Sequence, residues 1–186
     1  DNASTDNSLT ILADLFPTVS VIQLNKNYGF AEGYNRGLAK IEAEYFILLN
    51  SDVEVTENWI RPMLEYLENH PQYATCQPKI LDLKNRDYFE YAGAAGGFID
   101  YLGYPFCRGR IFDEIEKDLG QYDESLDILW TSGACMMIRA SSFNRLGGFD
   151  TDFFAHMEEI DLCWRIYQID EKAICLPESK VYHLGG

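Results

Sequence analysis

The sequence predicts an α/β protein whose central sheet is mainly parallel and covered by helices. Strand-like apolar runs alternate with helical patterns along all 186 residues. One run, YFILLNSDVE at residues 45–54, passes from apolar residues directly into Asn50 and Asp52. This pattern is expected where a buried strand ends at the sheet edge that binds ligands in open α/β proteins. The length fits one domain over residues 1–186, with a sizeable core.

The composition narrows the class of protein. Hydrophobic residues make up 47% of the chain and aromatic residues 14%, which excludes a disordered chain. The net charge of -15, with no basic block, argues against a nucleic-acid partner. A phosphate-bearing ligand would find few cations here, which favours a metal ion. The chain shows neither a run of membrane-spanning length nor a signal-peptide pattern. We therefore expect a cytoplasmic protein.

The cysteines predict buried thiols. The chain has 5 of them, with no C-x-x-C spacing that would indicate zinc or a disulfide framework. We expect them to act as small apolar side chains in a reducing compartment.

The first half of the chain predicts three helices and three strands. Turn-forming residues at 1–6 come first. Gly29, Gly33 and Gly37 then fall on one face of a helix, where they permit a neighbouring element to approach closely. These glycines do not form G-x-G-x-x-G, so a nicotinamide or flavin dinucleotide is not indicated. The elements expected are a helix over 8–16, a strand over 18–24, a helix over about 29–41, the strand that ends at Asn50, a helix from the cap Thr56 to His70, and a strand over 73–83.

The second half begins with a long stretch of glycine, aromatic and charged residues, 87–127. An irregular segment of this length is either an acceptor-binding region or a plain surface insertion. The elements expected after it are a strand over 128–139 with a break at 131–133, a helix over 140–146, an acidic helix start over 157–165, and strands over 173–176 and 180–184.

Asp52 is the first candidate for chemistry. Its carboxylate can offer oxygen ligands to Mg²⁺ or Mn²⁺, and such an ion can hold a diphosphate. An aspartate that closes a strand is also a common helix cap, so the residue alone does not decide between the two roles.

Seven segments, taken in order, resemble the family two inverting glycosyltransferases, in the rhamnosyltransferase-like and galactofuranosyltransferase-like branch. They are DNASTD at 1–6, NKNYGFAEGYNRGL at 25–38, LLNSDVEV at 48–55, WTSGACMMIR at 130–139, GGFDTDFF at 147–154, EEIDLCWR at 158–165 and VYHLGG at 181–186. The resemblance implies a GT-A fold. It also implies that the family's first strand, helix and second strand precede residue 1 and are absent from this chain.

The resemblance also implies a role for individual residues on the donor side. Asp1 would contact the base of the nucleotide, and Asn27 and Asn35 would line the nucleotide site. Asp52 would bind the metal as the second aspartate of a D-x-D motif, whose first position is Asn50 here.

On the acceptor side, Ser132 and Gly133 match the segment under the donor sugar and the acceptor. Glu159 falls where the family has its catalytic base, and Glu158 directly before it is the alternative. His183 matches a late histidine that completes the metal or diphosphate site.

The function implied is transfer of a sugar, with inversion, from a nucleotide-diphosphate donor to an acceptor hydroxyl. The cofactor would be Mg²⁺ or Mn²⁺, and the acceptor a glycan or lipid-linked saccharide in polysaccharide or cell-surface glycan assembly. Peripheral association with the inner membrane face is part of this expectation. Two other classes stay open. A sugar nucleotidyltransferase would need a glycine-rich phosphate loop with a lysine or arginine, which is not visible; a non-catalytic carbohydrate-binding domain could share the fold.

Overall fold

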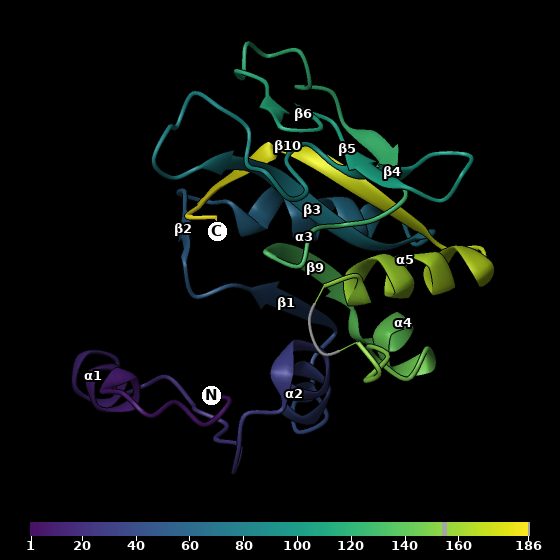
Figure 1. Cartoon of the computed structure of the whole chain (residues 1–186). Helices are drawn as coiled ribbons and strands as arrows, with labels where there is room; N and C mark the ends of the chain where they lie inside the picture. Colours follow the sequence, from purple (N-terminus) through teal and green to yellow (C-terminus); the bar gives the residue numbers. More distant parts are fainter. Residues whose placement is uncertain (154–155, 186) are drawn as a thin grey trace.

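The computed structural model describes residues 1–153 and 156–185, so Phe154 of the 147–154 motif and Gly186 of the last motif lie outside the described residues. A central sheet with helices on both faces forms the body of the molecule, and a second, smaller sheet lies above it in Figure 1. The central strands run in the order β1 (Tyr45–Leu49), β9 (Cys135–Arg139), β3 (Tyr73–Asp82), β10 (Lys172–His183) and β2 (Val53–Val55), with β8 (Leu126–Ile128) also paired to β10.

The α/β architecture is confirmed, but the prediction of a mainly parallel sheet is wrong. β3 and β10 pair in parallel, whereas β9 is antiparallel to both β1 and β3, and β2 and β8 are antiparallel to β10. Interior strands of either kind are buried on both faces, so their apolar runs do not reveal direction. The sheet is therefore mixed, with β9 reversed between β1 and β3.

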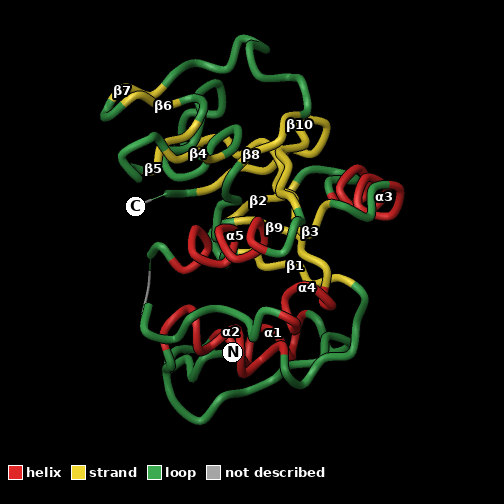
Figure 2. Tube along the Cα trace, turned by 90° about the vertical axis from the view of Figure 1, so that its right-hand side faces the viewer, coloured by secondary structure: helices red, strands yellow, loops and turns green. Residues whose placement is uncertain are grey.

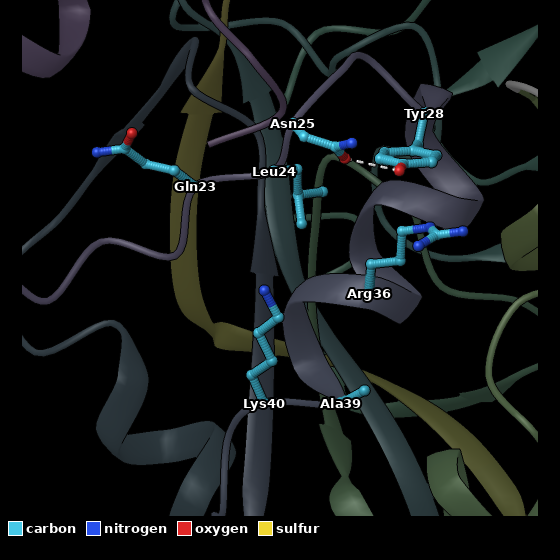
Figure 3. Close-up of a pocket in the computed structure, with 7 residues that line it drawn as sticks. All are labelled: Gln23, Leu24, Asn25, Tyr28, Arg36, Ala39 and Lys40. Atoms are coloured by element: carbon cyan, nitrogen blue, oxygen red, sulfur yellow. Dashed lines mark hydrogen bonds between the residues drawn. The ribbon is translucent and has the colours of Figure 1, made fainter.

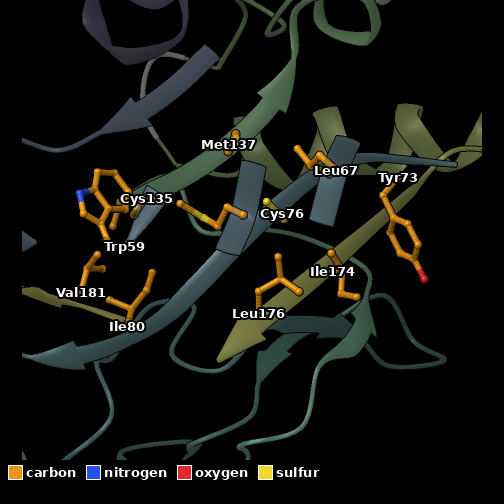
Figure 4. Packing of buried hydrophobic residues seen from close by; sticks show 12 residues of the cluster. Trp59, Leu67, Tyr73, Cys76, Ile80, Cys135, Met137, Ile174, Leu176 and Val181 are labelled. Carbon is orange, nitrogen blue, oxygen red and sulfur yellow. The ribbon is translucent and has the colours of Figure 1, made fainter. Parts of the chain in front are cut away.

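Alternation along the strands distributes the core between two layers. On β1, Ile47 packs toward α3 (Ile60–Asn69), while Phe46 and Leu48 pack toward the opposite layer. Trp59 and Leu67 fill the first layer (Figure 4), and Met63 belongs to the same cluster. The second layer contains α2 (Gly29–Leu38), α4 (Ala140–Arg145) and α5 (Glu158–Gln168), which lie away from α3 in Figure 2.

The N-terminal segment departs from the sequence prediction. The helix α1 (Ser8–Leu15) forms, but no residue in it is buried. Residues 18–24 were expected to form a strand and do not: Val19 and Val21 are exposed, and backbone bonds join Ile22 and Leu24 only to Asp1. One paired residue is too short a ladder for a strand, although the apolar alternation is present.

Several element boundaries also differ. α2 ends at Leu38. α3 begins at Ile60, so Thr56 does not cap this helix. The Thr56 hydroxyl donates instead to the Lys180 carbonyl, at 2.7 Å. The strand expected over 128–139 is divided between β8 and β9 at the predicted break. The last two predicted strands are one strand, β10, with an irregularity between Leu176 and Lys180.

The segment 87–127 is more regular than the sequence suggested. It forms a four-stranded antiparallel sheet from β4 (Gly97–Ile99), β5 (Pro105–Cys107), β6 (Arg110–Ile111) and β7 (Glu114–Ile115), which we call the hairpin sheet. Gly97 lies directly against the indole of Trp130, because a Cβ added there would lie 2.0 Å from Cε2 of Trp130. Glycine in this segment therefore permits close packing as well as turns.

Lys79 fastens the segment that follows the hairpin sheet to the main body. Its side chain, in the middle of β3, is 1% exposed, and its ammonium group pairs with the carboxylates of Asp118 and Asp123. Both Asp118 oxygens lie 3.0 Å from Nζ. A buried ammonium group requires such partners, because leaving it unpaired would cost several kcal/mol.

All five cysteines are free and buried, as predicted. None of the helices in the described part of the chain has the length and apolar character needed to cross a membrane.

Replacing Lys79 by methionine should destabilise the protein by about 3 kcal/mol, because Asp118 then loses its buried cation. Urea denaturation followed by circular dichroism measures this loss. Lys117→Met is the matched control, since Lys117 pairs with Asp87 at the surface, where an ion pair contributes about 1 kcal/mol or less. Equal losses in the two variants would contradict the role given to Lys79.

Candidate active site

The register of β10 brings Asp52 and His183 together. His183 ends β10 opposite Val53 of β2, and the amide of Leu184 donates to the Asp52 carbonyl at 3.1 Å. As a result, His183 Nε2 lies 3.2 Å from Asp52 Oδ1. The Asp52 side chain is 43% exposed, so one oxygen-rich face of this pair is open to solvent. The two predicted metal ligands therefore meet.

The donor atoms of this pair fit Mg²⁺ or Mn²⁺. An octahedral ion with ligands at about 2.1 Å places neighbouring ligands about 3 Å apart, close to the observed 3.2 Å. Across residues 1–153 and 156–185, no group of three or more His, Cys, Asp or Glu side chains is arranged to hold a metal. Such ions commonly keep waters and bind one or two protein ligands together with substrate phosphates. Asp52 and His183 suit that kind of site.

Glu90 is a site residue that the sequence analysis missed. It is 2% exposed, and its Oε1 lies 3.2 Å from His183 Nδ1. The Glu90 carboxylate is the main cause that raises the pKa of His183 above its ordinary value; burial opposes the rise and Asp52 adds to it. The sequence signal was a lone acidic residue within the aromatic and small-residue stretch 88–97, which reads equally as a surface turn.

A series of hydrogen bonds connects Glu90 with Ser132. The amide of Ala92 donates to Glu90 Oε2 at 2.6 Å, and the hydroxyl of Ser132 donates to the Ala92 carbonyl at 2.8 Å. Gln77, fully buried on β3, accepts from the Ser132 amide at 2.9 Å and donates to the Gly93 carbonyl at 3.0 Å. These bonds fix the segment that leads into β9.

Asn50 and Gly133 lie at the same end of the sheet. The Asn50 amide donates to the Ala134 carbonyl at 3.0 Å, which continues the β1–β9 ladder past Leu49. Gly133 lies close to both α2 and α5, because a Cβ added to it would lie 3.4 Å from the Phe30 ring and 4.0 Å from the carboxyl carbon of Glu159. The structure thus brings Asn50, Asp52, Ser132, Gly133, Glu159 and His183 to one end of the sheet.

Glu159 has the properties of a proton acceptor. Burial, with a smaller contribution from the Glu158 charge, raises the pKa of Glu159 to about 7. Its Oε2 is buried and has no hydrogen-bond partner among the described residues. Glu158 is more buried, at 4% exposed, and burial raises its pKa also. Since Glu159 is the one beside Gly133, the geometry favours it over Glu158 as the base.

The backbone before Glu158 sets the direction in which α5 starts. His156 and Met157 have φ of 72° and 76°, in the left-handed region that residues with side chains seldom adopt. Arg165 then holds α5 in place by donating to the carbonyls of Leu146 and Gly148 at 3.0 and 2.9 Å.

The side-chain oxygens of Asp1 and Asn27 accept hydrogen bonds from residues of the N-terminal turn and of the start of α2. Asp1 accepts from the Ala3 and Ser4 amides, while Asn27 accepts from Asn2 at 3.1 Å and from the Gly29 amide at 2.8 Å. These bonds build the turn chemistry expected at residues 1–6.

Asn35 is occupied in the same way. Its amide group donates to the Phe149 carbonyl at 2.8 Å and accepts from the Phe149 amide at 2.9 Å, so both ends join α2 to the segment after α4. The structure does not bring Asn35 to the Asp52 pair by any hydrogen bond.

A separate hollow lies beside α2 and contains none of the predicted site residues (Figure 3). In it, the Tyr28 hydroxyl donates to Asn25 Oδ1 at 2.7 Å, and the Arg36 guanidinium stacks 4.0 Å from the Tyr28 ring centre. The residues that line this hollow include neither a carboxylate nor an imidazole, so the hollow is distinct from the candidate site.

Known proteins resemble this chain in sequence and in fold. The N-acetylglucosaminyl-diphospho-decaprenol L-rhamnosyltransferase of Mycobacterium tuberculosis is 25% identical over 201 residues, an alignment that covers 98% of this chain. This chain spans 64% of the length of that relative.

Two solved structures share the fold. GalNAc-T7 with UDP, GalNAc and Mn²⁺ superposes with a TM-score of 0.72 at 18% identity, over 98% of this chain and 36% of the other. The mannosyltransferase PcManGT from Pyrobaculum calidifontis, with GDP-Man and Mn²⁺, gives 0.66 at 14% identity, over 99% and 46%. These likenesses show the GT-A fold. Residues 1–147 match the family described as Glycosyl transferase family 2. The chain therefore belongs to glycosyl transferase family 2.

Proposed function

We propose that the protein transfers a sugar, with inversion and with a divalent metal, from a nucleotide-diphosphate donor to an acceptor hydroxyl. The observation that carries this proposal is the position of two unlike groups at one end of the sheet. One is the Asp52–His183 pair, with an exposed carboxylate; the other is the buried Glu159 carboxyl beside Gly133. Charge neutralisation and proton removal are the two tasks of such a transfer.

Glu159 takes the proton of the acceptor hydroxyl in this proposal. A base works best with a pKa near the working pH, and burial brings the pKa of Glu159 to about 7. Gly133 adds no side chain beside this carboxyl group. Attack on the face of the sugar opposite the diphosphate then gives inversion, and no residue has to bond covalently to the sugar.

Asp52 and His183 hold the metal, which supplies Lewis-acid neutralisation of the leaving diphosphate. The two similar structures contain Mn²⁺, which supports a divalent ion here. Their nucleotide and nucleotide-sugar ligands support a donor of that class. On the donor side we assign Asp1, Asn27 and Asn50 as candidate contacts, with Asn35 acting by holding α2 against Phe149.

We assign a glycan or lipid-linked saccharide as the acceptor. The name of the Mycobacterium relative, which contains a diphospho-decaprenol acceptor, supports this class. A cytoplasmic protein working at the inner membrane face is consistent with such an acceptor.

The direct test is incubation with Mn²⁺, a panel of nucleotide sugars and saccharide acceptors. Sugar transfer or donor hydrolysis supports the proposal. Pyrophosphate exchange would indicate a nucleotidyltransferase, and sugar binding without turnover a carbohydrate-binding domain; either result contradicts it.

Glu159→Gln should lower the transfer rate by about 10²- to 10⁴-fold, since the amide cannot accept the proton, while donor affinity stays unchanged. Initial rates and donor titration calorimetry separate the two effects. Glu65→Gln, on the exposed face of α3, is the control for a lost carboxylate. If Glu158→Gln abolishes transfer and Glu159→Gln does not, the base is Glu158.

Asp52→Ala should remove the Mn²⁺-dependent part of donor binding, because the exposed oxygen ligand is lost. Calorimetry with and without Mn²⁺ measures this difference. Asp113→Ala, in the exposed turn between β6 and β7, should leave it unchanged. Metal-dependent donor binding that survives in Asp52→Ala would refute the assignment.

The pH profile follows from the raised pKa of Glu159, about 7. A base must be ionised to accept a proton, so kcat/KM should fall about tenfold for each pH unit below 7 and level off above it. Transfer rates across this range provide the measurement. A profile that stays flat from pH 7 downward would argue against Glu159 as the base.

A further inference from the structure

We infer that Glu90 is the positioning residue of the metal site: it holds the His183 imidazole by Nδ1, so that Nε2 faces Asp52 and the metal. This inference rests on the proposed metal role of Asp52 and His183. Glu90 lies behind the imidazole and is buried, so it acts on the ring rather than on the ion.

The geometry of the ring carries the inference. The two ring nitrogens point to different carboxylates, with Nε2 3.2 Å from Asp52 and Nδ1 3.2 Å from Glu90. The Asp52 side chain is open to solvent, whereas the Glu90 side chain is 3% exposed. Only the Asp52 side can therefore receive an ion together with substrate phosphates. In metal sites, a ligating histidine almost always donates its second N–H to a carboxylate, carbonyl or water.

Glu90 can supply the hydrogen-bond acceptor that Nδ1 of His183 lacks. Nδ1 is buried and lies 3.2 Å from Glu90 Oε1, and it has no hydrogen-bonded partner among the described residues. At 3.2 Å, a small rotation of the ring or the carboxylate completes the bond. A neutral imidazole with its proton on Nδ1 presents a lone pair at Nε2, as metal ligation requires.

The carboxylate itself is held by the backbone. Its Oε2 accepts from the Ala92 amide at 2.6 Å, and the Glu90 amide donates to the Ile80 carbonyl at 3.1 Å. This leaves Oε1 directed at His183. Since Ala92 also accepts from Ser132, Glu90 connects the metal end of the site with the segment that precedes β9.

The test is Mn²⁺ binding, measured by electron paramagnetic resonance with Mn²⁺ alone, in Glu90→Gln. The glutamine amide cannot accept from both Ala92 and Nδ1–H, since one of its two polar atoms is a donor. We expect Mn²⁺ affinity to fall about 10- to 100-fold. Glu54→Gln is the control for charge near the site, because Glu54 is half-exposed on β2 and pairs with Arg86; it should change the affinity less than about twofold.

A double-mutant cycle shows whether Glu90 acts through His183. If it does, adding Glu90→Gln to His183→Ala should weaken Mn²⁺ binding no further; independent, additive losses would overturn the inference. An unchanged affinity in folded Glu90→Gln would overturn it too. Should Glu90→Gln not fold, Glu90→Asp replaces it: its charge is kept, its carboxylate is withdrawn by one methylene, and a smaller loss is expected. If His183→Ala and Asp52→Ala both bind Mn²⁺ normally, the proposed metal site fails first, and this result is distinct from failure at Glu90 alone.

Discussion

The pairing of β10 with β3 and β2 is the constraint on which the site depends. β10 is parallel to β3 and antiparallel to β2, and this register sets His183 opposite Val53, next to Asp52. A slip of one residue would turn the His183 side chain to the other face of the sheet. The consecutive buried residues of β3 and β10 oppose such a slip, because these strands pack on both faces and a shift would move each side chain into a core layer shaped for a different one. Core packing thus fixes a contact between polar groups at the rim.

Buried polar residues then connect the rim into one unit. Gln77 and Glu90 are both buried. Gln77 bonds to Ser132 and Gly93, which are distant from it in the sequence, whereas Glu90 accepts from the nearby Ala92 amide and lies 3.2 Å from His183. Burying such groups without partners would cost free energy, so their bonds have to be made together, and this favours a single arrangement of the Ser132 segment. Glu159 differs from these two, because its Oε2 is buried without a hydrogen-bond partner in the described part of the chain, as is Oε2 of the adjacent Glu158. A polar atom of that kind is more typical of a reactive group than of a structural one.

Local patterns predicted much of the fold, and three residues named by the resemblance, Asp52, Glu159 and His183, lie at one end of the sheet. The apolar runs gave β1, β3 and β9, and the acidic start of α5 was placed correctly. Strand direction was not predictable, because β9 is buried on both faces like a parallel strand. The hairpin sheet was missed because its glycines, such as Gly97 against Trp130, read as irregular chain. The contact of Glu90 with His183 depends on tertiary packing across distant parts of the chain, which no local pattern records.

The manner in which the hairpin sheet is attached bears on where the chain can tolerate change. The sheet shares no strand with the central sheet; the bridge between Gly97 and Trp130 is one of its anchors, and the buried ammonium of Lys79 anchors the segment that follows it. Its turns can accept insertions or new side chains as long as these anchors are kept, since Asp52, Glu159 and His183 lie outside this sheet. Exchange of such a peripheral module would leave the candidate site in place.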